Sequence, residues 1–240
     1  MEKEREWLTQ RLAAMAEPQL AVFNRKLIPG LEREVYGIRV PRLRALAREL
    51  VARPDWREVA DAVPADAALE ELMVKGMTAG YARLPWQERW ERICGFVGFM
   101  DNWAVCDCCC STYTAVRRAR AEAWPDIVRY AASPREYDQR FAAVMLMDHF
   151  KTIEELPAVL DVLAGIRPAG YYAAMGVGWA FATCFVYCPE LTWNTLSSGR
   201  VPEECSGMAF RKILESRRTP EAWRAVVRQR ESAGRKKEKA

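Results

Sequence analysis

Apolar residues recur along nearly the whole chain at the three- and four-residue spacing of helices that bury one face. Alternating β-branched runs joined by tight hairpin turns, which would indicate strands, are essentially absent. The pattern therefore predicts an all-α protein. Clear examples of the helical spacing are Trp7, Leu8, Leu12 and Met15, and then Leu43, Leu46, Ala47 and Leu50.

Prolines fall mostly between these periodic segments, where they can open a helix without the loss of a hydrogen bond. Ser133 before Pro134 and Thr219 before Pro220 are typical of a helix N-cap followed by the first turn. Together these signals predict helices over residues 8–15, 19–28, 42–51, 55–62, 67–80, 86–97, 102–121, 124–131, 135–149, 153–163, 170–187, 190–197, 203–216 and 220–231.

The short connections between these helices predict antiparallel neighbours. Several segments pair at a spacing of roughly 35–45 residues, as in helical repeat arrays. We therefore expect an α-solenoid, rather than a compact bundle, formed by a single domain over residues 1–230. Residues 231–240 are basic and carry no apolar period, which predicts a disordered tail.

Composition adds little to this picture, since half of the residues are apolar and 28% are charged, as in ordinary globular proteins. The net charge of +4 is too small to indicate a partner. The first residues lack the apolar core of a signal peptide, and no stretch approaches the roughly 18 apolar residues of a membrane span. We expect a cytoplasmic protein with reduced thiols and no membrane partner.

Four of the eight cysteines fall within residues 106–110. They lack the paired two-residue spacings of structural zinc sites, and adjacent helical side chains point about 100° apart. Small buried hydrophobic residues are therefore favoured over a metal site, and we expect no metal and no cofactor. His149, the only histidine, follows an apolar run and is better placed at a helix C-terminus than in a Cys–His pair.

The segment around residue 103 combines an aromatic ring with a carboxylate. Asp101 or Asn102 is a natural N-cap, so a helix is expected to begin there. Trp103 and Asp107 are then four residues apart on one helix face. Apolar residues surround Asp107 in the sequence, and a carboxylate in such a place needs either a partner or a function.

Two later segments also carry candidate chemistry. Arg140 opens an apolar run and can hold a phosphate bidentately or pair with a buried carboxylate. Gly176 and Gly178 each cost a helix roughly 1 kcal/mol, which suggests close approach of a ligand or of another helix beside Trp179. Spacing alone favours a structural alternative, in which both tryptophans anchor the core and Asp107 with Arg140 forms a buried ion pair.

Taken in order, these segments resemble the DNA-alkylation-repair family of AlkD-like glycosylases. The resemblance covers about residues 20–220 and implies a curved α-solenoid of HEAT-like antiparallel helix pairs, with duplex DNA in a basic concave groove. The segments that carry it are Tyr36–Arg44, Asp101–Trp103 through Asp107, Gln139–Ala143, Gly178–Trp179, and Arg211–Ile213 followed by Glu215–Arg217.

The resemblance implies a monomer that hydrolyses the N-glycosidic bond of cationic N3- or N7-alkylated purines in double-stranded DNA, without flipping the base. By position, Trp103 and Trp179 would flank the deoxyribose, and Asp107 would be the catalytic carboxylate. Arg140 and Lys212 would hold the DNA backbone. The alternative is a non-catalytic helical scaffold that binds DNA or protein through the same face.

The chain departs from the family pattern at two places. The family's glycosylases place a tyrosine in the groove from an N-terminal helix, and residues 25–29 contain none. No arginine follows Trp179, where Ala180, Phe181 and Ala182 stand. These departures affect the expected binding of DNA more than the expected cleavage of the glycosidic bond.

Overall fold

Helices form almost all of the fold seen in a computed structural model, which describes residues 2–237 and the side chains of residues 3–230. The described residues contain fourteen α-helices, one short 3₁₀ helix and no strand, so the all-α prediction is confirmed. The chain divides into two compact units, residues 1–119 and 120–240. The single curved array over residues 1–230 stays a prediction.

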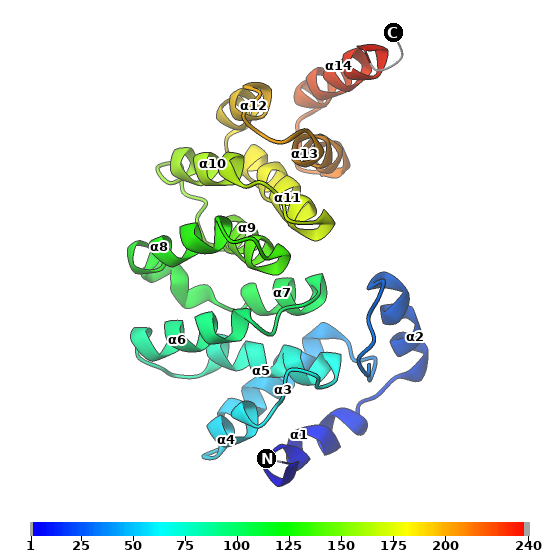
Figure 1. Cartoon of the computed structure of the whole chain (residues 1–240), viewed down its shortest axis with the longest axis vertical. Coiled ribbons are helices and arrows are strands. Elements are labelled where there is room, and N and C mark those ends of the chain that lie inside the picture. The colour runs from blue at the N-terminus through cyan, green and yellow to red at the C-terminus, as the bar shows by residue number, and fades with distance from the viewer. Residues whose placement is uncertain (1, 238–240) are drawn as a thin grey trace. The chain divides into compact units, whose positions relative to one another are not determined.

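The first unit is built around α5, which is buried over most of its surface. α5 contacts α3 and α7 as well as α1, α4 and α6 (Figure 1). Leu72 and Met77 of α5 are fully buried at the centre of this cluster. The helices are α1 (Glu2–Ala13), α2 (Pro18–Leu27), α3 (Val40–Val51), α4 (Trp56–Asp61), α5 (Leu69–Tyr81), α6 (Trp86–Val97) and α7 (Trp103–Cys110), followed by η1 (Thr114–Arg118).

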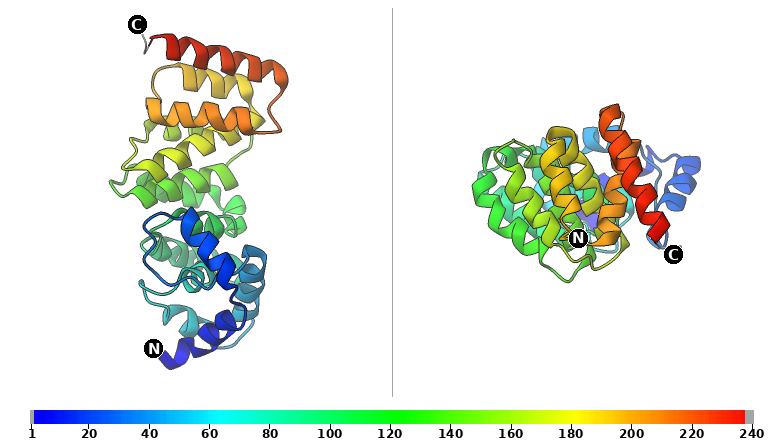
Figure 2. Two further views of the ribbon diagram at one scale, coloured as in Figure 1. Left: turned by 90° about the vertical axis from the view of Figure 1, so that its right-hand side faces the viewer. Right: turned by 90° about the horizontal axis from the view of Figure 1, so that it is seen from above.

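The second unit is built around α11, which contacts α9 and α13 most extensively and also contacts α10 and α12. The turned view in Figure 2 shows α11, α13 and α14 as successive layers of this unit. Phe181 and Phe185 of α11 are fully buried between the layers. The helices are α8 (Arg120–Ala131), α9 (Glu136–His149), α10 (Leu156–Gly165), α11 (Tyr171–Tyr187), α12 (Pro189–Ser197), α13 (Glu203–Glu215) and α14 (Glu221–Lys237).

The two glycines of α11 are explained by close helix packing. A methyl group on Gly178 would stand 2.6 Å from Cβ of Met208 and 3.0 Å from the backbone nitrogen of Ala209, both on α13. A methyl group on Gly176 would stand 3.2 Å from Cγ of Arg140 on α9. Of the two explanations open from the sequence, the structure supports packing.

Replacing Gly178 with alanine is therefore expected to destabilise the protein by about 1–3 kcal/mol, because α13 must shift to admit the methyl group. Gly207 on α13 is the matched control, since a methyl group there meets nothing within 4 Å. The Gly207→Ala variant is expected to be as stable as the wild type or up to about 1 kcal/mol more stable. Urea unfolding followed by circular dichroism measures both, and equal stability of the two variants would contradict the packing explanation.

The long helix predicted over residues 102–121 is wrong. α7 ends at Cys110, and the chain then forms a turn, the η1 helix and the start of α8 at Arg120. The hydroxyls of Ser111 and Thr112 donate to the carbonyls of Cys108 and Cys109, at 2.9 and 2.7 Å. Such side-chain bonds to the local backbone compete with continued helix formation.

The last helix is longer than predicted. α14 continues to Lys237, beyond the end expected at residue 231, and residues 238–240 lie outside the described part. The disordered tail over residues 231–240 stays a prediction. Among the described helices, none is long and apolar enough to cross a bilayer. α9 ends at His149, as predicted, and the imidazole is fully buried.

Candidate functional site

The start of α7 is fixed by its N-cap residue. Oδ1 of Asn102 accepts a hydrogen bond from the backbone nitrogen of Val105 at 3.0 Å, which satisfies one of the free amides of the first turn. The side-chain amide of Asn102 donates to Asp101, and Asp101 pairs with Arg33. These contacts fix the residue at which α7 begins, and with it the positions of Trp103 and Asp107 on the helix.

Trp103 is half-buried and is tied to α2 by its indole. Nε1 of Trp103 donates to the carbonyl oxygen of Leu27 at 3.2 Å. The ring borders a pocket of about 100 Å³ between α2, α5 and α7, whose lining includes Ile38 and Met73. The indole is thus held in place at the edge of a small apolar pocket, and part of it stays exposed.

Asp107 lies one turn further along α7 and is half-buried, so this residue is not sealed in the core. Arg44 of α3 approaches the same stretch of helix, where its Nη2 donates to Oγ of Ser111 at 2.8 Å. Burial raises the pKa of the Cys108 thiol to about 12, and Asp107 adds to this while Arg44 opposes it. A carboxylate and a guanidinium therefore lie close to Cys108.

Most side chains of the cysteine cluster at residues 106–110 lie in the hydrophobic core. Cys106, Cys109 and Cys110 are fully buried, as predicted for small hydrophobic residues, and Cys108 is half-buried. Burial also raises the pKa of Cys109 well above its ordinary value. Within residues 3–230, no group of three or more His, Cys, Asp or Glu side chains is arranged to hold a metal ion.

We expect Cys108 to react slowly with iodoacetamide at pH 8, although it is half-buried rather than sealed. The thiolate is the reactive form, and a pKa near 12 leaves very little of it at that pH. In the urea-unfolded chain the pKa returns to about 8.5 and labelling should become fast. Mass spectrometry of labelled peptides measures both rates, and equal labelling of Cys108 in the two states would contradict this expectation.

In the second unit, Arg140 lies on α9 and its side chain packs against α11. It is 4% exposed, and its Nη1 donates to the carbonyl oxygen of Tyr172 at 2.8 Å. The carboxylate of Glu136 accepts from the backbone nitrogen of Tyr172 at 2.6 Å. These two hydrogen bonds join the N-terminal part of α9 to the first turn of α11.

Trp179 and Lys212 are brought together at a second pocket, which has a volume of about 260 Å³. Trp179 of α11 is 39% exposed and is therefore not a core anchor. Lys212 of α13 forms an ion pair with Glu215 at 2.8 Å at the same pocket. Arg218, which the sequence did not single out, also lines it and lies over the ring of Tyr187 at 5.4 Å.

The site residues thus form two groups, one in each unit. Trp103 and Asp107 share a face of α7, and Trp179 shares a pocket with Lys212. Sequence reasoning missed the role of Arg44, although Arg44 belongs to the segment that carries the resemblance. It lies 67 residues from Ser111 in the chain, and helical spacing gives no signal for so distant a contact.

Comparison with known proteins decides the family. A sequence profile described as "DNA alkylation repair enzyme" matches residues 8–167, which is more than half of the chain. The chain belongs to this family. No curated protein and no solved structure matches it significantly.

Membership of the DNA alkylation repair family places the protein in the repair of alkylated DNA. The matched region contains the whole of α7, with Trp103 and Asp107, and also Arg140 on α9. Trp179 and Lys212 lie beyond it. The family match therefore bears most directly on the first group of site residues.

Proposed function

We propose that the protein is a DNA glycosylase that removes positively charged N3- or N7-alkylated purines from duplex DNA, acting as a monomer. The observation that carries this proposal is that Asp107 and Trp103 are both half-buried rather than sealed in the core, and lie one helical turn apart on α7. The family supplies the class of substrate, which is alkylated DNA.

Alkylation at N3 or N7 makes the base a cationic leaving group, so its departure needs no strong general acid. The bond between C1′ and the base nitrogen breaks, and its electron pair leaves with the base, which becomes neutral. Positive charge then develops on the sugar, as in glycoside hydrolysis. A fixed carboxylate at Asp107 stabilises this charge and can accept a proton from the water that attacks C1′.

The two tryptophans would act through their ring faces. An indole face attracts a neighbouring cation by roughly 0.5–2 kcal/mol. Trp103 and Trp179 both keep exposed ring surface, which supports a role beside the sugar of the damaged nucleotide. Because these contacts act on the sugar, the base can leave from within the duplex without being flipped into a pocket.

Lys212 and Arg140 support DNA binding in different ways. The side chain of Lys212 is exposed and pairs with the exposed Glu215, so a DNA phosphate can compete for its ammonium group. Arg140 is buried against the carbonyl of Tyr172. We propose that Arg140 supports DNA binding from beneath the surface, by fixing the first turn of α11 through this hydrogen bond.

Incubation of the purified protein with N-methylated duplex tests the proposal. We expect release of free 7-methylguanine or 3-methyladenine, detected by chromatography with mass spectrometry, and an abasic site left in the strand. A methylated duplex that keeps all its purines under single-turnover conditions would refute the enzymatic proposal.

The affinity for undamaged duplex should also fall steeply with salt, since neutralised phosphates release counterions. Fluorescence anisotropy between 50 and 200 mM salt, a range in which several phosphate contacts cost orders of magnitude in affinity, measures this dependence. Salt-sensitive binding without base release would indicate the non-catalytic DNA scaffold instead.

A further inference from the structure

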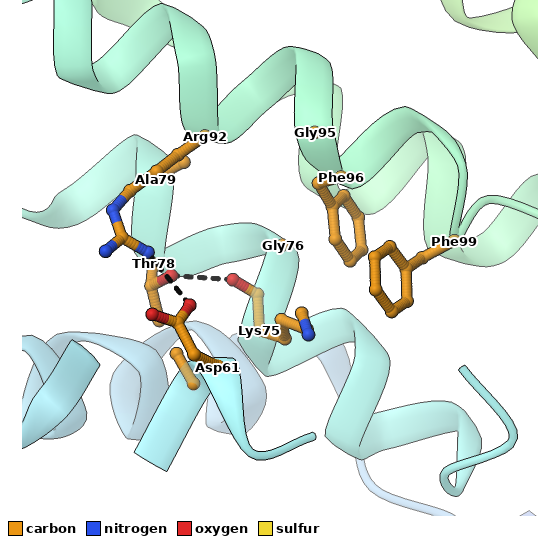
Figure 3. A pocket seen from close by; sticks show the side chains of 10 residues that line it. Asp61, Lys75, Gly76, Thr78, Ala79, Arg92, Gly95, Phe96 and Phe99 are labelled. Atoms are coloured by element: carbon orange, nitrogen blue, oxygen red, sulfur yellow. Dashed lines mark hydrogen bonds and ion pairs between the residues drawn. The ribbon is translucent and has the colours of Figure 1, made fainter. Parts of the chain in front are cut away.

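A pocket outside the proposed DNA site has the composition of a ligand site. It has a volume of about 230 Å³ and lies in the first unit between α4, α5 and α6. Figure 3 shows Arg92 and Asp61 on one side, the rings of Phe96 and Phe99 on the other, and Lys75 between them. This volume is below the roughly 300–1,000 Å³ of pockets for drug-sized ligands, so only a small ligand fits.

The pocket is separate from the surface beside Trp103. α5 contributes Leu69, Glu70 and Met73 to the small pocket at Trp103, and Lys75, Gly76, Thr78 and Ala79 to this one. At 100° per residue, these two sets lie roughly 150° apart around the helix. A ligand here would therefore not occupy the same face of α5 as a ligand at Trp103.

Lys75 is a half-buried cation with incomplete compensation. Its ammonium donates to the carbonyl oxygen of Val63 at 2.6 Å and lies 4.2 Å from the centre of the Phe99 ring. Among residues 3–230, no carboxylate lies within 4.0 Å of it. Burial lowers the pKa of Lys75, which means that desolvation destabilises its charged form. A lysine ammonium has three donors, so two remain for an anionic ligand.

Arg92 supplies a second cation at the rim of the pocket. Its Nη1 contacts Asp61 at 3.1 Å and its Nε contacts Glu88 at 3.5 Å. The side chain of Asp61 is 61% exposed, so this ion pair is weakened by water and can open. An incoming anion could take the place of Asp61 on the guanidinium while it also binds Lys75.

The opposite wall is apolar and flat. The rings of Phe96 and Phe99 are nearly parallel, at 6°, with their centres 5.7 Å apart. Gly95 also lines the pocket, in the interior of α6, and a methyl group there would meet nothing within 4 Å. Packing does not require glycine at this position, although glycine weakens a helix relative to alanine. The missing methyl group keeps the pocket open.

From this arrangement we propose that the α4–α6 pocket binds a small organic anion, with its acidic oxygens on Lys75 and Arg92 and a flat apolar body against Phe96 and Phe99. Both a carboxylate and a phosphate head carry this chemistry. Charge-assisted hydrogen bonds to lysine and arginine hold either head.

Calorimetric titration of the full-length protein tests the proposal, with benzoate and phenyl phosphate as probes and benzamide as an uncharged analogue. We expect saturable binding of at least one anion, about tenfold or more tighter than benzamide. The tighter anion distinguishes a carboxylate-bearing from a phosphate-bearing ligand. Failure of both anions to bind, or equal binding of benzamide, would overturn the proposal.

Two variants locate the site. Lys75→Met is expected to weaken anion binding by about tenfold or more, because it removes the charge-assisted bond. The control is Lys151→Met, which removes the lysine that lies over the ring of Tyr187 in the second unit and should leave binding unchanged. Gly95→Ala is a second test, in a variant that is expected to fold well. It should raise Tm by about 2–4 °C, while its methyl group weakens binding of the anion. Wild-type affinity in both Lys75→Met and Gly95→Ala would overturn the assignment.

Discussion

The Asp107→Asn variant is expected to release 7-methylguanine on the order of 10²–10³-fold more slowly than the wild type in single-turnover assays. The amide has nearly the same shape as the carboxylate, but it carries no negative charge to stabilise the cationic sugar. It also cannot accept the proton of the attacking water as a carboxylate does. Because the charge matters only as the bond breaks, affinity for the methylated duplex should change by no more than about threefold.

The matched control for this variant is Asp161→Asn. Asp161 is an exposed carboxylate in the second unit, paired with Arg200 at 2.9 Å, and its loss should leave both rate and affinity near wild-type values. Equal losses of rate and DNA affinity in Asp107→Asn would argue against a catalytic carboxylate and for a residue that only supports binding.

The Glu70→Ala variant is expected to lower the free energy of unfolding by about 3 kcal/mol or more. Glu70 is 1% exposed, and its carboxylate accepts from the backbone nitrogens of Tyr36, Gly37 and Ile38 at 3.0, 2.8 and 3.3 Å. Alanine leaves these three amides without their acceptor in a buried place, and each unsatisfied group costs about 1–3 kcal/mol. The loop that leads into α3 should then lose its fixed conformation.

Glu49→Ala is the control for this second variant. Glu49 is exposed and pairs with Arg11 at 2.7 Å, so its loss should cost less than about 1 kcal/mol. Urea unfolding followed by tryptophan fluorescence compares the two. Hydrogen exchange at residues 36–38 adds a local measure, and unchanged protection in Glu70→Ala would contradict the role assigned to its carboxylate.

Much of the fold was accessible from the sequence because its signals are local. The helix predicted over residues 86–97 agrees with α6, and the one predicted over residues 170–187 agrees closely with α11. The break after Cys110 was not accessible, since no proline or glycine marks it. Thr112 at that turn packs against Gly80 on α5, and a contact between residues so far apart leaves no periodic trace.

The candidate site shows the same limit. The i, i+4 spacing correctly placed Trp103 and Asp107 on one helix, and the N-cap signal at Asn102 was confirmed. Spacing could not show that Trp179 stays exposed beside Lys212, or that Arg140 is buried against Tyr172. These outcomes depend on which helices pack together, which is a property of the whole unit.

The single hydrogen bond of Trp103 has a consequence for selectivity. An indole has one polar hydrogen, and here the backbone carbonyl of Leu27 takes it. The ring is left with nothing that can read the pattern of donors and acceptors along a base edge, and it can respond only to electric field and shape. A damaged nucleotide at this ring would therefore be distinguished by its positive charge, so adenine and guanine adducts should be accepted on similar terms.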